Sequence, residues 1–376
     1  MNRKTAGLFA VAMAVGLVTA GLWPFDFRPP NHVNWLKDRA GLSFQPDSIA
    51  YDPEPTAWSA RGQPDEPAAF TMELWLEPGR VPYTDLFDIL TIDDGNSPPA
   101  IRLFQWKTEL LLRVRDRTGY RGSREVGPAG VLIAETPRFI TIAVAPAGTS
   151  FYSNGALLKY CPNFTVPNSQ SAGRLILGNA AAGKHPWTGN LFGLALYRRA
   201  LDTSAVAQHY ALWTNNQAAR LTAEPGLAAL YGFGEGNGQW ANDLSTNRHR
   251  LLIPAQYTVL QTCVLELPWG PDPIEWSDLD DVAINILGFV PFGFVACHYR
   301  RLARPDARGR NIVWAICIGA IISLAIELIQ VWLPNRDSSA TDLFCNTLGT
   351  FLGALLATKL RIRTFPAEKT AETNPV

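Results

Sequence analysis

The sequence predicts a membrane α-helical bundle of four spans joined to an extracytoplasmic all-β jelly-roll sandwich. Two observations predict this fold class. Four uncharged or nearly uncharged apolar runs, one at the N-terminus and three near the C-terminus, approach the roughly 20 residues that cross a bilayer. The stretch from about residue 25 to 275 is instead of mixed composition, with short alternating segments between turn residues. Lys plus Arg and Asp plus Glu number 33 each, so the overall charge favours no nucleic-acid partner.

The first apolar run, residues 5–23, follows Arg3 and Lys4 and contains no charge. It fits a membrane span. It also fits a secretory signal peptide, because residues 18–20 (Val-Thr-Ala) resemble a small-residue cleavage site. The other three runs are expected at about residues 282–299, 311–333 and 343–358.

The loops between the runs differ in charge, and this asymmetry predicts the orientation. Positive loops stay in the cytoplasm. The loop between the third and fourth runs has one arginine and two aspartates. Both termini are therefore expected in the cytoplasm, with residues 29–280 outside. The positive charges that decide this are Arg300, Arg301, Arg304, Arg308, Arg310, Lys359, Arg361 and Arg363.

The middle segment shows the period-two alternation of β-strands. Residues 70–77 alternate four apolar side chains with Thr71, Glu73, Trp75 and Glu77, and residues 110–115 alternate in the same way. One helix is expected at 202–213, with Asp202 among the residues that can cap it. Many short strands and one helix are typical of two packed antiparallel sheets.

Chemistry-bearing residues in the middle segment are few. Glu73 and Glu77 share a strand face, so a glycosidase pair is one reading and a solvated face the other. Residues 93–96 fit a calcium site or a polar hairpin turn. Cys161 and Cys263 are expected to form a disulfide or to remain free. The histidines show no metal-ligand spacing, so the sequence predicts no metal site and no cofactor. Which of the 12 tryptophans are exposed does not follow from the sequence.

Polar side chains recur in the three C-terminal runs. The pattern D-x-x-x-N-x-L-G begins at Asp281 and again at Asp342. An aspartate at a helix start caps free N–H groups, and an asparagine one turn later lies about 6 Å deeper. The intervening run is antiparallel to these two, and it brings Glu327 and Gln330 to the same outer layer. The candidate polar membrane site therefore comprises Asp281, Asn285, Glu327, Gln330, Arg336, Asp342 and Asn346.

Two interpretations of this polar layer remain open. Polar groups within a bilayer are functional candidates by default, and Glu327 is the strongest. Its carboxyl is expected to be neutral or paired with Arg336. Alternatively, the aspartates cap helices and the asparagines bond across them. The opposite half of the bundle is expected to be apolar, which argues against a transport path. Four glycines are expected to allow close helix approach: Gly288, Gly293, Gly349 and Gly353.

Ordered phrases in the middle segment carry a resemblance. "FTMELWLEPG", "FYSNGALL", "RLILGN" and "WTGNLFGLALYRRALDTSAVAQHY" resemble the laminin-G-like, concanavalin A-like lectin/glucanase family over residues 30–268. The resemblance implies a sandwich that binds sugars or proteins. The E-x-D-x-x-E pattern of the glucanase relatives is absent, so binding is expected rather than hydrolysis.

A second resemblance lies in the apolar runs. "WPFDF", "NILGFVPFGF" and "SLAIELIQVWLPNRDSSATDLFCNTLGTFLGALL" resemble the VanZ-like family, which implies a small multi-span bacterial membrane protein linked to teicoplanin resistance. The long insertion after the first run departs from that family and favours a retained span over a cleaved signal. The matching positions are Asn285, Pro291, Gly293, Glu327, Gln330, Arg336, Asp342, Asn346 and Gly349.

Together these observations predict four segments: an N-terminal span (1–28), an extracytoplasmic concanavalin A-like domain (29–270), a VanZ-like three-span region (271–362) and a cytoplasmic tail (363–376). The expected function is recognition of a glycan or envelope protein beside a polar membrane site in the bacterial plasma membrane, with membrane lipids as further partners. A membrane enzyme acting on lipid-linked precursors and a pure anchor for a binding module are the alternatives. No catalytic motif is recognised.

Overall fold

The computed structural model describes residues 2–60, 62–82, 85–115, 122–267 and 276–360. The chain divides into two compact units. One consists of Met1–Phe27 with Cys263–Val376 and contains the long helices; the other, Arg28–Thr262, contains the strands. We call them the helical unit and the sandwich unit. The predicted boundary between residues 270 and 271 lies outside the described residues.

The sandwich unit consists of two antiparallel sheets. The first has the order β1-β2-β14-β5-β10-β11-β12, with β15 also paired to β14. Its strands are β1 (Asn34–Trp35), β2 (Leu42–Phe44), β5 (Phe70–Pro78), β10 (Arg138–Ala145), β11 (Gly148–Ser153), β12 (Ala156–Pro162), β14 (Gly189–Tyr197) and β15 (Leu227–Tyr231).

The second sheet has the order β16-β17-β3-β13-β6-β7-β8-β9, with β4 also paired to β13. Its strands are β3 (Ala50–Tyr51), β4 (Thr56–Ala57), β6 (Leu86–Asp93), β7 (Ile101–Trp106), β8 (Glu109–Arg115), β9 (Ser123–Val126), β13 (Ala172–Leu177), β16 (Trp240–Ala241) and β17 (Leu251–Leu252).

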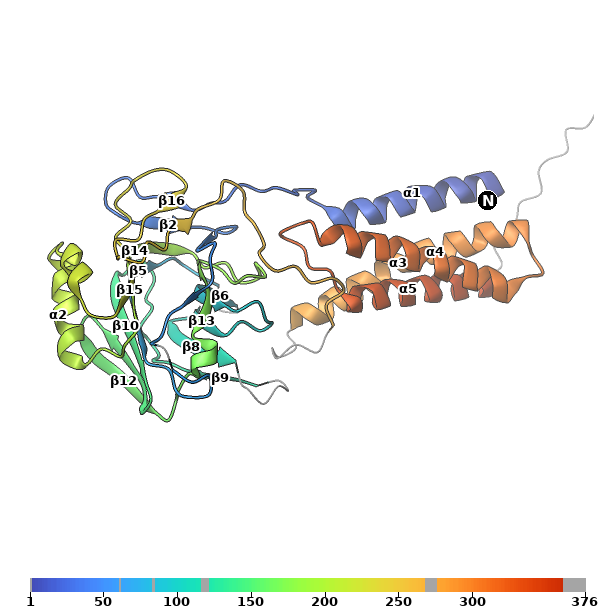
Figure 1. Cartoon of the computed structure of the whole chain (residues 1–376). Helices are drawn as coiled ribbons and strands as arrows, with labels where there is room; N and C mark the ends of the chain where they lie inside the picture. The colour runs from blue at the N-terminus through green and yellow to red at the C-terminus, as the bar shows by residue number, and fades with distance from the viewer. Residues whose placement is uncertain (1, 61, 83–84, 116–121, 268–275, 361–376) are drawn as a thin grey trace, which may run out of the picture. The chain divides into compact units, whose positions relative to one another are not determined.

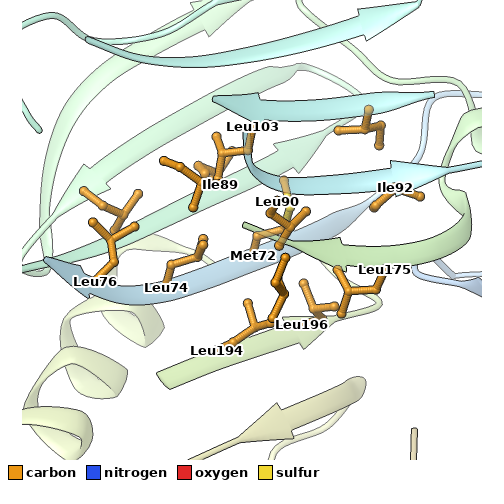
Figure 2. Close-up of a cluster of buried hydrophobic side chains, with 14 of the residues drawn as sticks. Met72, Leu74, Leu76, Ile89, Leu90, Ile92, Leu103, Leu175, Leu194 and Leu196 are labelled. Atoms are coloured by element: carbon orange, nitrogen blue, oxygen red, sulfur yellow. The ribbon is translucent and has the colours of Figure 1, made fainter. Parts of the chain in front are cut away.

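The core of the sandwich lies between the two sheets, as the predicted alternation requires. Met72, Leu74 and Leu76 of β5 are fully buried and face side chains of the second sheet such as Leu90 of β6 and Leu103 of β7 (Figure 2). Period-two alternation places every second side chain of a strand on this inner face. The jelly-roll prediction is confirmed.

The outer face of the first sheet is covered by helix α2 (Thr203–Thr214), which begins where the sequence predicted and has Asp202 as its N-cap (Figure 1). The Asp202 carboxylate accepts a hydrogen bond from the Ala205 N–H at 2.9 Å. Two short 3₁₀ helices, Asn168–Gln170 and Ala218–Ala223, complete the unit.

Among its described residues, the helical unit has four helices long and apolar enough to cross a membrane: α1 (Arg3–Leu22), α3 (Trp276–Ala303), α4 (Arg308–Gln330) and α5 (Ala340–Lys359) (Figure 1). The helices differ by three residues or more from the predicted apolar runs at both ends of α3 and α4 and at the start of α5. Helix α4 ends at Gln330 rather than at 333, where the Leu333 N–H turns back to the Gln330 carbonyl. Helix α5 begins at Ala340 rather than at 343, because Ser339 caps it.

Helices α3 and α5 approach each other closely at glycines. A Cβ on Gly293 would lie 2.1 Å from the Thr350 carbonyl oxygen, and a Cβ on Gly353 would lie 1.9 Å from that of Val290. Gly349 faces the Ile286 carbonyl in the same way, at 2.1 Å. The prediction of close helix approach is confirmed at these three positions. It was wrong for Gly288, whose Cβ would meet no atom within 4 Å.

Candidate functional site

Among the described residues of the helical unit, the most buried acidic or basic side chain of a helix is that of Glu327, whose exposed fraction is 1%. Its Oε2 accepts a hydrogen bond from the backbone N–H of Ser339 at 2.8 Å. Ser339 is itself the N-cap of α5, because its Oγ accepts from the N–H groups of Thr341 and Asp342. A carboxylate is stabilised at a helix N-terminus by the free N–H groups and the helix dipole. Glu327 therefore joins α4 to the start of α5.

The side chain of Asn346 lies deeper between the same two helices and is 4% exposed. Its Nδ2 donates to the Oγ of Ser323, which is fully buried, at 3.0 Å. Its Oδ1 is buried and has no hydrogen-bond partner among the described residues. A buried amide oxygen without a partner costs about 1–3 kcal/mol, so this atom is a candidate acceptor for a bound group.

Asp342, on the first turn of α5, faces α3. Its carboxylate interacts with the side chain of Asn285 through a hydrogen bond, and the exposed carboxylate of Asp281 lies close enough to act on it electrostatically. The Asp342 carboxylate in turn lies close enough to Glu327 to act on it electrostatically. The repeated D-x-x-x-N pattern therefore places Asp281 and Asn285 beside Asp342, which in turn lies close to the buried Glu327. We call Asp281, Asn285, Ser323, Glu327, Asp342 and Asn346 the polar cluster.

Gln330 and Arg336 make a different set of contacts. The Gln330 Nε2 donates to the carbonyl of Gly21 at 2.9 Å. The Nε and Nη2 of Arg336 both donate to the carbonyl of Trp23, at 3.1 and 2.8 Å. The last carbonyls of a helix lack partners within it, so these two side chains hold the C-terminal end of α1. The predicted ion pair between Arg336 and Glu327 does not form among the described residues.

A chain segment that the sequence did not place contacts the residues at the start of α5. The Glu266 N–H donates to the Ser338 carbonyl at 2.8 Å, and the Ala340 N–H donates to the Glu266 carbonyl at 3.0 Å. The Leu265 N–H donates to the Ser338 Oγ at 3.0 Å. These bonds cover the N-terminus of α5 with backbone from outside the helices. Only the capping pattern Ser339-x-x-Asp342, typical of a helix start, is readable in the sequence.

The expectation of an apolar opposite half of the bundle was wrong. His298 on α3 is 3% exposed, and neither ring nitrogen has a hydrogen-bond partner among the described residues. Asn311 on α4 is 1% exposed, and its Nδ2 donates to the Arg304 carbonyl at 2.7 Å. In the sequence, each is an isolated polar residue near the end of an apolar run.

In the sandwich unit, Glu73 lies beneath α2 and is fully buried. It is 2.8 Å from the Nδ1 of His209 and accepts from the Tyr197 hydroxyl at 3.2 Å and the Trp213 Nε1 at 3.4 Å. The expectation of a solvated strand face was wrong at this position, because α2 covers it. Glu73 and Glu77 therefore do not form an open pair of carboxylates.

The four residues 93–96 form a turn held by an arginine. Arg115 donates to both carboxylate oxygens of Asp94, and the Asp93 Oδ1 accepts from the Gly95 N–H at 3.2 Å. Burial would raise the pKa of the Asp94 carboxyl, but the bonds and charge of Arg115, with the bonds from Asn96, outweigh burial and lower it. This ion pair supports the hairpin-turn interpretation. Cys161 and Cys263 are free thiols.

Two family models match this chain. Residues 229–362 match VanZ/LLP1, and residues 56–207 match the concanavalin A-like lectin/glucanases superfamily. The chain joins a VanZ domain to a concanavalin A-like domain. The VanZ match begins within the sandwich unit, at β15, and extends through α3, α4 and α5. Together with four helices of spanning length, the VanZ domain indicates a membrane protein.

Three solved structures show what the chain is similar to. The binding domain of Paraclostridial Mosquitocidal Protein 1 is 16% identical, with 50% of this chain and 47% of that chain covered and a TM-score of 0.34. A Bacteroides ovatus protein described as carbohydrate binding is 16% identical (58% and 61% covered, TM-score 0.40). The Ruminococcus gnavus IT-sialidase CBM40, bound to α2,3 sialyllactose, is 10% identical (46% and 95% covered, TM-score 0.34).

The chain thus spans about half the length of the mosquitocidal binding domain it matches. The fold assignment rests on the two sheets and the family model, and similarities with TM-scores this low do not strengthen it. No curated protein matches the chain.

Proposed function

We propose that this VanZ protein acts in the bacterial cell envelope. Its concanavalin A-like domain binds a glycan or an envelope protein outside the plasma membrane, and its polar cluster holds the polar part of an amphiphilic envelope molecule. The observation that carries the membrane part is Glu327, a carboxyl group 1% exposed within an apolar helix. The Oδ1 of Asn346, which has no hydrogen-bond partner among the described residues, supports it. Polar groups at membrane depth are costly to keep and therefore mark functional sites.

The proposed orientation follows from loop charge. Arg300, Arg301 and Arg304 lie at the end of α3, and Arg308 and Arg310 at the start of α4, so this end of the hairpin stays in the cytoplasm. Both termini then lie in the cytoplasm, and residues 29–280 lie outside. Glu327 lies near the end of α4, and Asp342 lies at the start of α5, so both are at the helix ends away from these arginines. In the proposed orientation the polar cluster therefore lies in the outer leaflet.

The experiment for the external part uses the full-length protein in nanodiscs, with empty nanodiscs as the control. Cell-wall and exopolysaccharide fractions are titrated and binding is measured by calorimetry. Saturable binding to a glycan fraction supports the proposal. Binding to protein but not to glycan assigns the domain to an envelope protein, and no binding to any fraction contradicts recognition altogether.

The experiment for the membrane part compares strains carrying Glu327→Gln, Asp342→Asn and Asn346→Ala with wild type. The measured quantities are the pool of lipid-linked envelope precursors and the sensitivity to teicoplanin. Loss of a wild-type phenotype at normal protein abundance supports a site in the polar cluster. A change in the precursor pool favours the enzymatic alternative. A role in resistance to glycopeptides is the most specific version of the proposed function, and it rests on the VanZ match alone.

A second candidate function, a pure membrane anchor for the sandwich unit, is favoured by one observation. Gln330 and Arg336 bond to α1, and Glu327 bonds to the start of α5, so all three also hold the bundle together. Under this alternative, Glu327→Gln leaves every envelope phenotype unchanged. Replacement of the four helices by an unrelated membrane anchor then restores full function, whereas the polar-cluster proposal expects a loss.

A further inference from the structure

Trp240 is the one exposed tryptophan among the described residues of the sandwich unit, with 37% of its surface accessible. Trp58, Trp187 and Trp213 of this unit are buried. Trp240 begins β16, the edge strand of the second sheet. An exposed indole at a sheet edge presents an apolar surface to solvent. The residues near it therefore indicate what kind of ligand could cover it.

The loop before Trp240 is fixed at several points. Phe233, at its start, is 1% exposed and stacks on Tyr231. The Gly238 carbonyl accepts from the Trp35 Nε1 at 2.8 Å, and the Glu235 Oε1 accepts from the Asn242 N–H at 2.6 Å. A loop held in this way loses little conformational entropy when a ligand binds to it.

The chain after Trp240 is held equally firmly. The Asp243 carboxylate accepts from the N–H groups of Leu230, Ser245 and His249, at 2.8, 2.8 and 2.9 Å. The Ala241 side chain between them is fully buried. Both flanks of the exposed indole are therefore rigid.

The backbone of the loop leaves room for a ligand. Gly236 and Gly238 have φ values of +71° and +90°, which favour glycine. A Cβ built on Gly234, Gly236 or Gly238 would meet no atom within 4 Å, so the space beside this backbone is open. A bound molecule can approach the loop without displacing side chains.

Several exposed polar residues lie near Trp240 in the chain. Asn237, Gln239 and Asn242 are exposed, and their side-chain amides bond to no other described residue. The Arg250 guanidinium lies over the Trp240 ring at 4.7 Å. The charged groups of the loop, Glu235 and Arg250, are of opposite sign. An aromatic surface with free amide donors and acceptors and no net charge matches the apolar face and the hydroxyl groups of a neutral sugar.

We propose that residues 233–242 together with Arg250, which we call the Trp240 loop, are the glycan-binding subsite of this protein. The loop takes a pyranose unit of a neutral glycan, with the sugar's C–H face on the indole and its hydroxyls on the amides of Asn237, Gln239 and Asn242. The inference rests on the proposed function, because it assigns a place and a ligand class to the glycan recognition proposed there.

The test uses the full-length protein in nanodiscs and calorimetric titration with neutral hexasaccharides of glucose, mannose and N-acetylglucosamine. Alginate hexasaccharide serves as the anionic comparison. The variants are Trp240→Ala, Trp240→Phe and Gln239→Ala. The matched control is Trp106→Ala, because Trp106 is also a partly exposed tryptophan at a strand end with a cation over its ring, at 4.4 Å from the Lys107 Nζ. Thermal unfolding checks that each variant is folded.

We expect wild type to bind at least one neutral hexasaccharide. Trp240→Ala raises its Kd at least tenfold, Trp240→Phe and Gln239→Ala raise it less, and Trp106→Ala leaves it unchanged. If wild type and Trp240→Ala bind equally, the Trp240 loop is not the subsite while the proposed glycan recognition stands. Preference for alginate overturns the neutral ligand class. If wild type binds no glycan, both proposals fall. If Trp240→Ala does not fold, Gln239→Ala decides, since its exposed side chain leaves the fold intact.

Discussion

The carboxylate of Glu327 and the backbone N–H of Ser339 are joined by a hydrogen bond of 2.8 Å. The acid that the sequence marks as the strongest candidate for function is thus also the group that fixes the start of α5. Glutamine can accept the same bond without the charge, whereas alanine cannot. The two roles are therefore separable by substitution.

We expect Glu327→Ala to lower the free energy of unfolding of the helical unit by about 1–2 kcal/mol, because a buried N–H loses its acceptor. Glu327→Gln is expected to stay within about 0.5 kcal/mol of wild type. Thermal unfolding in detergent measures both. Equal destabilisation by the two variants would mean that the charge, rather than the accepted bond, stabilises this end of α5.

Arg336→Ala is expected to loosen the C-terminal end of α1, since two hydrogen bonds to the Trp23 carbonyl are lost. Hydrogen bonds from a charged donor contribute about 1.5–3 kcal/mol. Faster hydrogen exchange at residues 18–23 measures the effect. Arg310→Ala is the control, because Arg310 is exposed and lies at the start of α4, at the other end of that helix from Arg336. Unchanged exchange in Arg336→Ala would contradict this role.

Gly353→Ala is expected to disrupt the contact between α3 and α5, because the new Cβ would lie 1.9 Å from the Val290 carbonyl oxygen. Backbone atoms cannot move aside cheaply, so a loss of about 1–3 kcal/mol follows. Gly288→Ala, which meets no atom within 4 Å, is expected to be neutral or slightly stabilising. Thermal unfolding compares the pair, and equal melting temperatures would argue against close helix packing at Gly353.

His209→Ala is expected to destabilise the sandwich unit strongly, because it leaves the fully buried Glu73 without its closest partner. Breaking a buried pair costs about 3–5 kcal/mol. Gln208→Ala, at an exposed position of the same helix, is the control. Protease sensitivity of α2 and urea unfolding of the full-length protein measure the difference. A neutral His209→Ala would show that Tyr197 and Trp213 suffice to hold Glu73.

The Asp94–Arg115 pair predicts a dependence of stability on pH. Because the pKa of Asp94 is lowered in the folded state, its contribution is present above the ordinary aspartate pKa of about 4 and is lost as the pH falls through the lowered value. Asp94→Asn is therefore expected to be less stable than wild type at pH 7, with the gap closing below about pH 4. Urea unfolding across this range checks the sign. A gap that widens in acid would contradict it.

Much of the architecture was readable from local patterns. Alternation in residues 70–77 predicted the inward set Met72, Leu74 and Leu76, and apolar length predicted four helices. Both patterns depend only on the spacing of apolar residues within one strand or one helix and on the burial of those residues. The partners of Glu73 and Arg336 were not readable, because each bonds to a segment more than a hundred residues away in the chain.

The sequence by itself determined that this protein has spanning helices, a two-sheet sandwich and polar residues at matching depths, since period, length and spacing are local properties. Only the tertiary structure decided how those polar residues are used. In the structure, Gln330 and Arg336 bond to the end of α1, and Glu327 accepts a bond at the start of α5. Trp240 is exposed at a sheet edge, whereas Trp58, Trp187 and Trp213 are buried. Such choices depend on which distant segments pack together, and chain-distant contacts have no signature in a single sequence.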